Sequence, residues 1–213
     1  MRPATHWRPA QGEPTVTALL RHGQTPMSVQ KRYAGRTDAP LTEVGVQQAA
    51  AAKRLASAGL GVIVTSPLRR TVQTAQAVAA VTGAAVVTDD GFRETDFGAW
   101  EGLTFAEVRE RWPAEISAWL ADPDVAPPGG ESFTDVSARV TEALDRVLAA
   151  RAGQTVLIVS HVTPIKMLVA AALLAPPAAL YRMHLDVAAL SEIDWYADGP
   201  AVLRSFNDTS HLS

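Results

Sequence analysis

Chemically reactive side chains follow four apolar segments of the sequence, each at the point where the segment ends. One histidine at the end of a strand is more often structural than catalytic. Four groups of reactive side chains that all follow the carboxyl end of an apolar segment are hard to produce by chance. If the segments are parallel strands, their carboxyl ends meet at one edge of a sheet, where open α/β sheets bind ligands. The groups are Arg21-His22-Gly23 after TVTALL, Arg69-Arg70 after VIVTS, Glu94 after AVVT and His161 after TVLIVS.

These residue types suit the transfer of a phosphoryl group. Arginine offers planar, forked and permanently charged donors, which match a tetrahedral phosphate dianion better than lysine does. A neutral imidazole is a competent nucleophile, and at its reference pKa of about 6.5 roughly three-quarters of it is unprotonated at pH 7. An alkoxide leaving group needs a proton, which a carboxylic acid can supply. The side chains together therefore favour phosphoryl transfer through a phosphohistidine.

The segments between these groups alternate between strand and helix patterns. A helix is predicted over residues 42–58, capped by Thr42 and ended by Gly59. Its expected buried face is Val44, Ala51, Leu55 and Ala58. A second helix is predicted over residues 67–81, with Pro67 in its first turn and Gly83 as its stop. The order strand, helix, strand, helix, strand predicts parallel pairing with right-handed crossovers.

The alternation fails between residues 91 and 130, which we interpret as a helical lid insertion over the edge of the sheet. Its helices are indicated by the capping box TFAE, which starts at Thr104, and by Pro113. A further helix with Val136, Val140, Leu144 and Val147 on one face follows, and two strands are predicted over residues 187–196 and 201–206, joined through Asp198-Gly199.

The predicted fold is a three-layer α/β/α sandwich, with a mostly parallel sheet, helices on both faces and the lid. Residues 1–14 are expected to form a flexible N-terminal tail or linker remnant, because they are polar and rich in proline. Residues 15–213 are expected to form one domain, since a chain of this length supports a single substantial core.

The composition and charge of the chain limit the classes of partner that it is expected to bind. A net charge of −3 provides no basic field for nucleic acid or an anionic membrane, so an anion has to be held locally by a few arginines. Pro176 and Pro177 interrupt the longest apolar run, which is too short to span a bilayer, and the N-terminus has no signal-peptide pattern. The absence of cysteine fits a reducing cytoplasm. No spacing resembles a carboxylate metal cage, so neither a metal nor another cofactor is expected.

Six motifs occur in order along residues 19–166: RHGQT, LTEVGVQQA, SPLRRTVQTA, ETDFGAWEG, PGGES and VSHVTPIK. In this order they resemble the motifs of the histidine phosphatase superfamily, in its phosphoglycerate-mutase-like branch. The C-terminal YRMHLDVAALSEIDWYADG is most similar to the acid phosphatase domain of bifunctional ribonuclease H/acid phosphatases, and alpha-ribazole phosphatases are close relatives of that domain. The resemblance implies a metal-independent phosphomonoester hydrolase acting on a small phosphorylated metabolite, with alpha-ribazole phosphate as one candidate.

The resemblance also implies roles for individual residues. His22 is the phosphorylated nucleophile and Arg21 its phosphate-binding neighbour. Glu94 is the proton donor to the leaving group, and His161 is the second histidine of the phosphate pocket. The substrate-binding positions that follow from the resemblance are Gly23, Thr25, Ser28, Gly35 and Val162.

Two of these assignments depend on the register of a motif. The arginine of the S-x-L-x-R signature falls on Arg70, whereas Arg69 fills the variable place and is expected at the surface. Six residues after His22, many members of the family carry an asparagine that touches phosphate. This chain has Ser28 there, whose hydroxyl can still donate one hydrogen bond but over a shorter reach.

The charge of the lid bears on the substrate. Between Thr95 and Gly130 the chain carries only Arg109 and Arg111 against seven acidic residues, whereas mutases of the family use extra basic residues here. We expect such a lid to repel a bisphosphorylated sugar acid. The aromatic residues of the lid suit an uncharged, partly apolar group on the phosphoester. For Trp112 and Trp119 we expect ordinary packing under the lid instead. The aromatic residues are Phe97, Trp100, Phe105, Trp112 and Trp119.

Two alternatives to a phosphatase stay open. One is a phosphoglycerate mutase, which the charge of the lid disfavours. The other is a non-catalytic module that binds a phosphorylated ligand; its expected signature would be the loss of His22 or Glu94, and both are present. The oligomeric state is undecided, with a homodimer as one possibility.

Overall fold

The computed structural model describes residues 11–212, with the backbone alone at 53, 54 and 56. Most of the expected N-terminal tail therefore lies outside the described residues. Six strands form one sheet in the order β3-β2-β4-β1-β5-β6. The first four in this order pair in parallel, and β5 and β6 are antiparallel. Their bounds are β1 (Thr15–Arg21), β2 (Leu60–Thr65), β3 (Val86–Thr88), β4 (Thr155–Ser160), β5 (Leu190–Trp195) and β6 (Ala201–Asp208).

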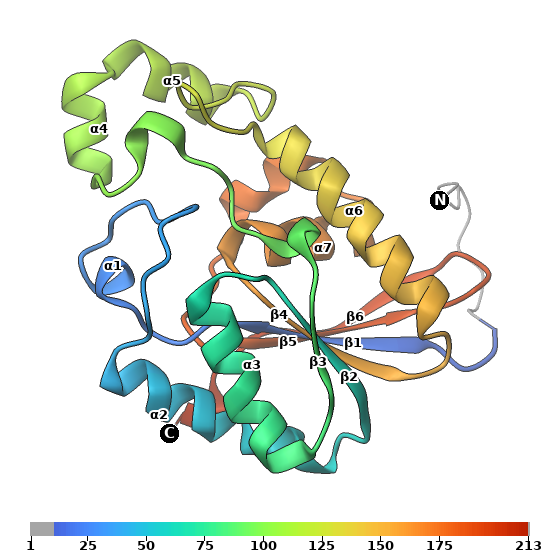
Figure 1. Ribbon diagram of the computed structural model, residues 1–213. Helices are drawn as coiled ribbons and strands as arrows, with labels where there is room; N and C mark the ends of the chain where they lie inside the picture. The colour runs from blue at the N-terminus through green and yellow to red at the C-terminus, as the bar shows by residue number, and fades with distance from the viewer. Residues whose placement is uncertain (1–10, 213) are drawn as a thin grey trace.

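Helices cover both faces of the sheet, as Figure 1 shows: α2 (Glu43–Ala51) and α3 (Arg69–Thr82) on one face, α6 (Phe133–Ala150) and α7 (Val162–Ala172) on the other. Successive residues of each strand alternate between the two layers, as the period of a β-strand requires. In β1, Leu19 packs in the core with α6 and α7, whereas Ala18 and Leu20 pack in the core with α3. The predicted three-layer α/β/α sandwich is confirmed.

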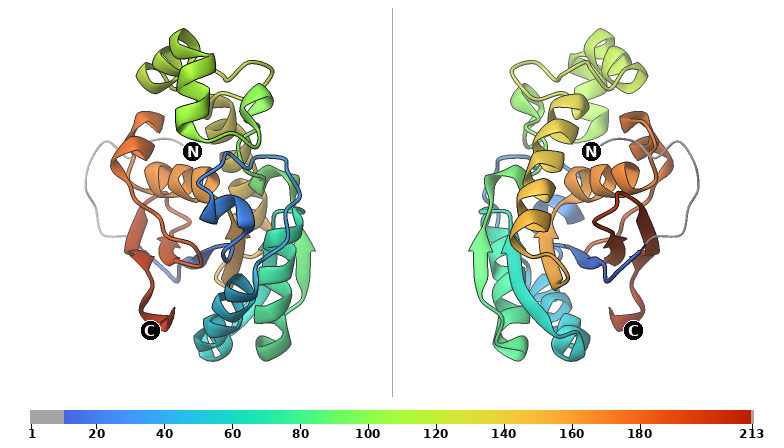
Figure 2. Two further views of the ribbon diagram at one scale, coloured as in Figure 1. Left: turned by 90° about the vertical axis from the view of Figure 1, so that its left-hand side faces the viewer. Right: turned by 90° about the vertical axis from the view of Figure 1, so that its right-hand side faces the viewer.

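The lid stands beyond the layer of α6 and α7, at the opposite end of the molecule from α2 (Figure 2). Its helix α4 (Phe105–Arg111) begins at the expected capping box, in which Thr104 and Glu107 bond each other's backbone N–H. Pro113 opens α5 (Pro113–Ala121) as expected. The remaining short helices are α1 (Pro26–Val29), η1 (Ala52–Ser57), η2 (Asp90–Phe92), η3 (Gly98–Trp100), η4 (Pro177–Arg182) and η5 (Ser210–Leu212).

The helix after Thr42 differs from the prediction in its α-helical length and in part of its buried face, since Leu55 is buried as predicted but Val44 is not. The α-helix ends at Ala51 and continues as η1, and Val44 is 47% exposed. The buried residues of α2 are Gly45 and Ala49. Gly45 sets this rotation because a Cβ there would collide with the carbonyl oxygen of Gln24, so α2 lies with this backbone against the loop after β1.

The strand order places β4 between β1 and β2, although β4 follows them by about a hundred residues of sequence. The backbone N–H of His22 donates to the carbonyl of Ser160 at the end of β4 (3.0 Å), which draws two of the reactive strand ends together. None of the helices within residues 11–212 is long and apolar enough to cross a membrane.

Candidate active site

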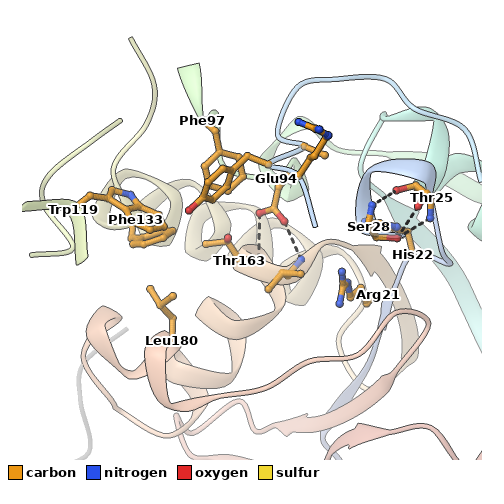
Figure 3. Close-up of a pocket in the computed structure, with 14 residues that line it drawn as sticks. Arg21, His22, Thr25, Ser28, Glu94, Phe97, Trp119, Phe133, Thr163 and Leu180 are labelled. Atoms are coloured by element: carbon orange, nitrogen blue, oxygen red, sulfur yellow. Dashed lines mark hydrogen bonds between the residues drawn. The ribbon is translucent and has the colours of Figure 1, made fainter. Parts of the chain in front are cut away.

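A cavity of about 270 Å³ opens where β1 and β4 end and where the lid approaches the sheet. In Figure 3 the Glu94 carboxylate lies between Trp119 and Phe133 on one side and Thr25, Ser28 and His22 on the other. The cavity thus has one polar and one aromatic side. Its polar lining residues are Arg21, His22, Thr25, Ser28, Arg32, Glu94 and Thr163, and the others are Tyr33, Ala34, Phe97, Trp119, Phe133, Val162 and Leu180.

His22 presents a neutral ring to this cavity. Burial lowers its pKa well below the usual 6.5, and the charges of Arg70 and Arg21 lower it further. Its Nδ1 lies 2.8 Å from the carbonyl oxygen of Gly23. Because a carbonyl only accepts hydrogen bonds, Nδ1 carries the proton and Nε2 keeps a free lone pair. The arrangement provides an uncharged imidazole with one nucleophilic nitrogen.

His161 and Arg70 form a fully buried layer against His22. The rings of His161 and His22 meet edge to face, with centroids 5.1 Å apart. Arg70 Nε donates to His161 Nδ1 (3.2 Å), so His161 carries its proton on Nε2 and donates to Ser66 Oγ (2.8 Å). Burial is the main reason that the pKa of His161 lies well below 6.5. Neither His161 nor Arg70 is among the residues that line the cavity.

Arg70 is also the anchor of the loop after α1. Its Nη1 donates to the carbonyl of Thr37 (2.6 Å), and its Nη2 donates to the carbonyls of Ala34 (2.8 Å) and Gly35 (3.0 Å). Gly35 therefore contributes a backbone oxygen that positions Arg70. Arg69, the neighbouring residue, is exposed.

Arg21 brings a positive charge directly to the cavity wall. Its Nη1 donates to the carbonyl of Leu185 (2.6 Å), and its buried Nε has no partner among the described residues. Burial lowers its pKa to about 10, so the guanidinium stays charged at neutral pH. Asp186, next to Leu185, is tied to Asn207 by two hydrogen bonds, Asp186 N to Asn207 Oδ1 and Asn207 Nδ2 to Asp186 Oδ2. The C-terminal strand thereby helps to hold the segment on which Arg21 rests.

Glu94 is held by three backbone amides. Its Oε1 accepts from Thr95 N (2.9 Å) and Thr163 N (3.2 Å), and its Oε2 accepts from Val162 N (3.1 Å). A carboxylate oxygen can accept two hydrogen bonds, so Oε2 keeps one acceptor position. Val162, expected to bind substrate, thus holds Glu94 through its amide and also lines the cavity.

A clamp from α6 fixes the loop that carries Glu94. Arg139 Nη1 donates to the carbonyls of Gly91 and Arg93 (both 2.8 Å), and Nη2 donates to the carbonyl of Glu94 (3.1 Å). Glu131 neutralises Arg139 through Nε (2.6 Å) and Nη2 (2.9 Å). We name Arg139 and Glu131 the α6 clamp.

Gly23 has a structural reason to lack a side chain. A Cβ at Gly23 would collide with the carbonyl oxygen of Gly45 at the start of α2. The resemblance to the family implied that Gly23 binds substrate. The close packing of Gly23 against Gly45, and of Gly45 against Gln24, is enough to explain why residue 23 is a glycine, and it needs no bound ligand.

Thr25 and Ser28 line the cavity and cap the short helix α1. Ser28 Oγ accepts from Thr25 N and donates to Thr25 O (both 2.9 Å), and Thr25 Oγ1 accepts from Ser28 N (3.2 Å). The hydroxyl proton of Ser28 is thus used within the cap. Ser28 is therefore less able to donate a hydrogen bond to a bound phosphate than its position in the motif suggested.

The acidic residues of the lid act on the cavity only indirectly, through the ion pair of Glu107 with the lining residue Arg32 (2.9 Å). None of the seven acidic residues between Thr95 and Gly130 lines the cavity. The lid instead contributes Phe97 and Trp119, and this corrects the assignment of Trp119 to ordinary packing alone. Four further lining residues were not expected from the sequence, because they come from loops or helices rather than from strand ends: Arg32, Tyr33, Phe133 and Leu180.

Residues 17–209 match the sequence family described as the histidine phosphatase superfamily (branch 1). The chain belongs to this superfamily. The bifunctional protein Rv2228c of Mycobacterium tuberculosis is 51% identical over 208 residues, covering 97% of this chain and 57% of that protein. The chain thus spans little more than half the length of this relative. A Yersinia pestis protein named "Probable phosphoglycerate mutase GpmB" is 35% identical over 203 residues, which are 91% of this chain and 93% of that protein.

Solved structures of other proteins have the same fold. The mycobacterial glucosyl-3-phosphoglycerate phosphatase Rv2419c, in complex with VO3, has 33% sequence identity and a TM-score of 0.83, covering 92% of this chain and 100% of that chain. An Escherichia coli protein provisionally described as an alpha-ribazole-5'-P phosphatase has 28% identity and a TM-score of 0.84, covering 92% and 97%. The chain therefore shares the fold of proteins that are named as phosphatases, as the motifs predicted.

Proposed function

We propose that this histidine phosphatase hydrolyses small phosphate monoesters, without a metal ion, through a phosphohistidine at His22. The observation that carries the proposal is the neutral His22 ring, with its proton on Nδ1 and its Nε2 free beside the charged Arg21. An uncharged imidazole is needed to attack phosphorus, and a fixed positive charge is needed to hold the phosphate.

The first step forms one bond and breaks another. His22 Nε2 attacks phosphorus while the bond from phosphorus to the ester oxygen breaks, and Glu94 gives its proton to that oxygen. In the second step a water molecule attacks the phosphohistidine, and the Glu94 carboxylate takes the proton from that water. Inorganic phosphate leaves, and His22 and Glu94 return to their starting states.

Two positive charges and one ring dipole oppose the negative charge that develops on the transferring group. Arg21 lies at the cavity wall, and the buried Arg70 lies behind the two histidines. Charges fixed in a dry site stabilise a transition state more strongly than they would in water. His161 adds an oriented ring dipole, because Arg70 and Ser66 fix its tautomer.

The substrate is proposed to be a small phosphorylated metabolite in the cytoplasm. Alpha-ribazole phosphate and glucosyl-3-phosphoglycerate become candidates through the names of the structural neighbours. The aromatic wall of Phe97, Trp119 and Phe133 suits an alcohol portion that carries a ring. A phosphoglycerate mutase remains the alternative because of the Yersinia pestis relative, and it would transfer the phosphoryl group between sugar-acid hydroxyls rather than to water.

The test is labelling by phosphate combined with a screen of phosphorylated metabolites in the presence of a chelator. We expect the wild-type protein to release inorganic phosphate and to trap acid-labile label on His22. His22→Ala should abolish both, and His184→Ala, at an exposed position, should change neither. Label retained in His22→Ala would contradict the phosphohistidine, and label that moves to an acceptor alcohol instead of water would favour the mutase.

A further inference from the structure

The segment of residues 185–189, which leads into β5, supports the strand end that carries Arg21 and His22. Arg21 N donates to the carbonyl of Ala189 (3.1 Å), and Ala188 N donates to the carbonyl of His22 (3.1 Å). These bonds fix the backbone. The Arg21 guanidinium itself has a single hydrogen-bond partner within residues 11–212, the carbonyl oxygen of Leu185, to which Nη1 donates (2.6 Å). The direction in which the guanidinium points therefore depends on the peptide group between residues 185 and 186.

A β-bulge in β6 places Asn207 next to this segment. Leu190 of β5 pairs with Asp208, whereas Glu192 pairs with Ser205, so β6 has one residue more than β5 over this stretch. Asn207 lies within the bulge and has a φ of 56°, in the left-handed region that asparagine adopts more readily than most residues. Bulges often re-aim a side chain, and this one directs the Asn207 amide toward residue 186.

Two hydrogen bonds join the Asn207 amide to Asp186. The backbone N–H of Asp186 donates to Asn207 Oδ1 (2.7 Å), and Asn207 Nδ2 donates to Asp186 Oδ2 (2.9 Å). The bonds from Asn207 and His184 lower the pKa of Asp186, so this carboxylate only accepts, which fixes the orientation of the amide. Asn207 N in turn donates to Oγ of the buried Ser191 (3.2 Å), which ties the bulge to β5.

One planar peptide group links these bonds to the phosphate site. The N–H that donates to Asn207 and the carbonyl that accepts from Arg21 belong to the same peptide unit, that of residues 185 and 186. Because a peptide unit is planar, a bond that fixes its N–H also fixes the direction of its carbonyl. Hydrogen bonds at both ends of one unit also polarise and strengthen each other. Asn207 thus acts on Arg21 through a single rigid unit, although it does not line the cavity.

We propose that Asn207 is a positioning residue for phosphate binding, which holds the peptide group of residues 185 and 186 so that the Arg21 guanidinium faces the bound phosphate. The inference rests on the proposed phosphatase function, in which Arg21 opposes the charge of the phosphoryl group. A misdirected charge in a preorganised site loses much of its effect on the bound group.

The carboxylate of Asp186 acts on the same guanidinium in a different way, through its charge. Burial lowers the pKa of Arg21, and the negative charges of Glu94 and Asp186 oppose that effect. The charge of Asp186 therefore reaches Arg21 and weakens its attraction for an anion. The charge of Asp186 and the peptide bond held by Asn207 thus have opposite effects on phosphate binding, and substitutions can separate them.

The test measures the inhibition constant, Ki, of inorganic phosphate against the hydrolysis of p-nitrophenyl phosphate. Ki does not depend on the fraction of the enzyme that is folded, so a loss of stability alone leaves it unchanged. Asn207→Gly keeps a residue that readily adopts the left-handed φ, but it removes both side-chain bonds. We expect it to raise Ki by roughly three- to tenfold, the effect of losing about one hydrogen bond, and to lower kcat/KM at least as much.

Two further variants separate the bond from the charge. Asp186→Asn keeps the backbone N–H and an acceptor for Asn207 Nδ2, but it removes the negative charge near Arg21, so it should not raise Ki. His184 bonds the same carboxylate from the solvent side, with a side chain that is 81% exposed. His184→Ala is therefore the matched control and should leave Ki unchanged.

An unchanged Ki in Asn207→Gly, or an equal rise of Ki in Asp186→Asn, would overturn the role of Asn207. A wild-type protein without His22-dependent hydrolysis of p-nitrophenyl phosphate would instead contradict the proposed phosphatase function. Calorimetric titration with inorganic phosphate would then give its dissociation constant without turnover, and the same comparison of variants would still decide the role of Asn207.

Discussion

Glu94 illustrates how one side chain can be both fixed and reactive. Three amides hold its two oxygens, and one acceptor position of Oε2 is left for a proton. Glu94→Gln should reduce the hydrolysis of an alkyl phosphate by on the order of a hundredfold or more, and that of an aryl phosphate much less, because a phenoxide leaves without a proton. The measurement is kcat for both esters. Equal losses would leave Glu94 as a positioning residue.

Arg70 and Arg69 make a matched pair of adjacent arginines. Arg70 is buried and touches His161, whereas Arg69 is exposed. Arg70→Ala should lower kcat/KM on the order of a hundredfold, the effect of losing one electrostatic donor, and Arg69→Ala should be nearly silent. Steady-state kinetics of the two variants on one substrate measures which arginine is needed. A large loss of kcat/KM in Arg69→Ala would mean that the S-x-L-x-R motif had been aligned wrongly by one residue.

The sequence could predict the residues at strand ends because a parallel sheet brings such positions to one edge. His22 and His161 meet for this reason, because they directly follow β1 and β4, whereas Glu94 lies beyond η2 on the loop that the α6 clamp holds. It could not predict that Arg32 and Phe133 line the same cavity, because they follow or begin helices whose placement depends on tertiary packing. The only sequence signal that Arg32 might lie near the site was its position ten residues after His22.

Among the elements, α6 contributes Phe133 to the cavity and also acts on the site through Arg139, which does not line the cavity. Its clamp holds three carbonyls of the loop that carries Glu94. Arg139→Lys keeps the charge but cannot replace these bonds, since an ammonium has three donors and no planar fork. We expect kcat for alkyl phosphates to fall by roughly tenfold, as for a misplaced catalytic group, with KM nearly unchanged.

A second arginine on the same helix provides the control. Arg146 pairs with Asp89 at the surface and bonds no carbonyl of the Glu94 loop. Arg146→Lys should therefore leave kcat unchanged. An aryl phosphate that suffers as much as an alkyl phosphate in Arg139→Lys would mean that the clamp does not act through Glu94.

Local signals predicted most elements, and tertiary contacts determined the exceptions. The capping box at Thr104 and the left-handed Gly83 at the end of α3 act within a few residues, so the sequence could locate both. The rotation of α2 depends on the contact of Gly45 with Gln24, which no helical periodicity contains. The place of β4 between β1 and β2 likewise has no local signal.

For the whole molecule, the two buried histidines make stability depend on pH. The pKa of His22 and of His161 lies well below 6.5 in the folded protein because burial disfavours the charged ring. The unfolded chain binds these protons at about pH 6.5, so the free energy of unfolding should fall as the pH drops below that value. Each histidine contributes a slope of up to about 1.4 kcal/mol per pH unit.

Urea unfolding between about pH 7 and about pH 5 measures this slope. His161→Asn removes one of the two groups and should make the slope shallower by up to about 1.4 kcal/mol per pH unit. His184→Asn, whose side chain is 81% exposed, should leave it as in the wild type. An unchanged slope in His161→Asn would mean that the folded protein already carries that proton.

The central position of β4 also determines when the enzyme can become active during its synthesis. As the chain leaves the ribosome, β1 and β2 emerge first, but they have no common neighbour until Thr155–Ser160 follows. The amides of Val162 and Thr163, which hold Glu94, emerge later still. A nascent chain can pair β2 with β3, but β1 and the other edge of β2 stay unpaired until β4 has been made, the interval in which exposed strands are most prone to aggregate.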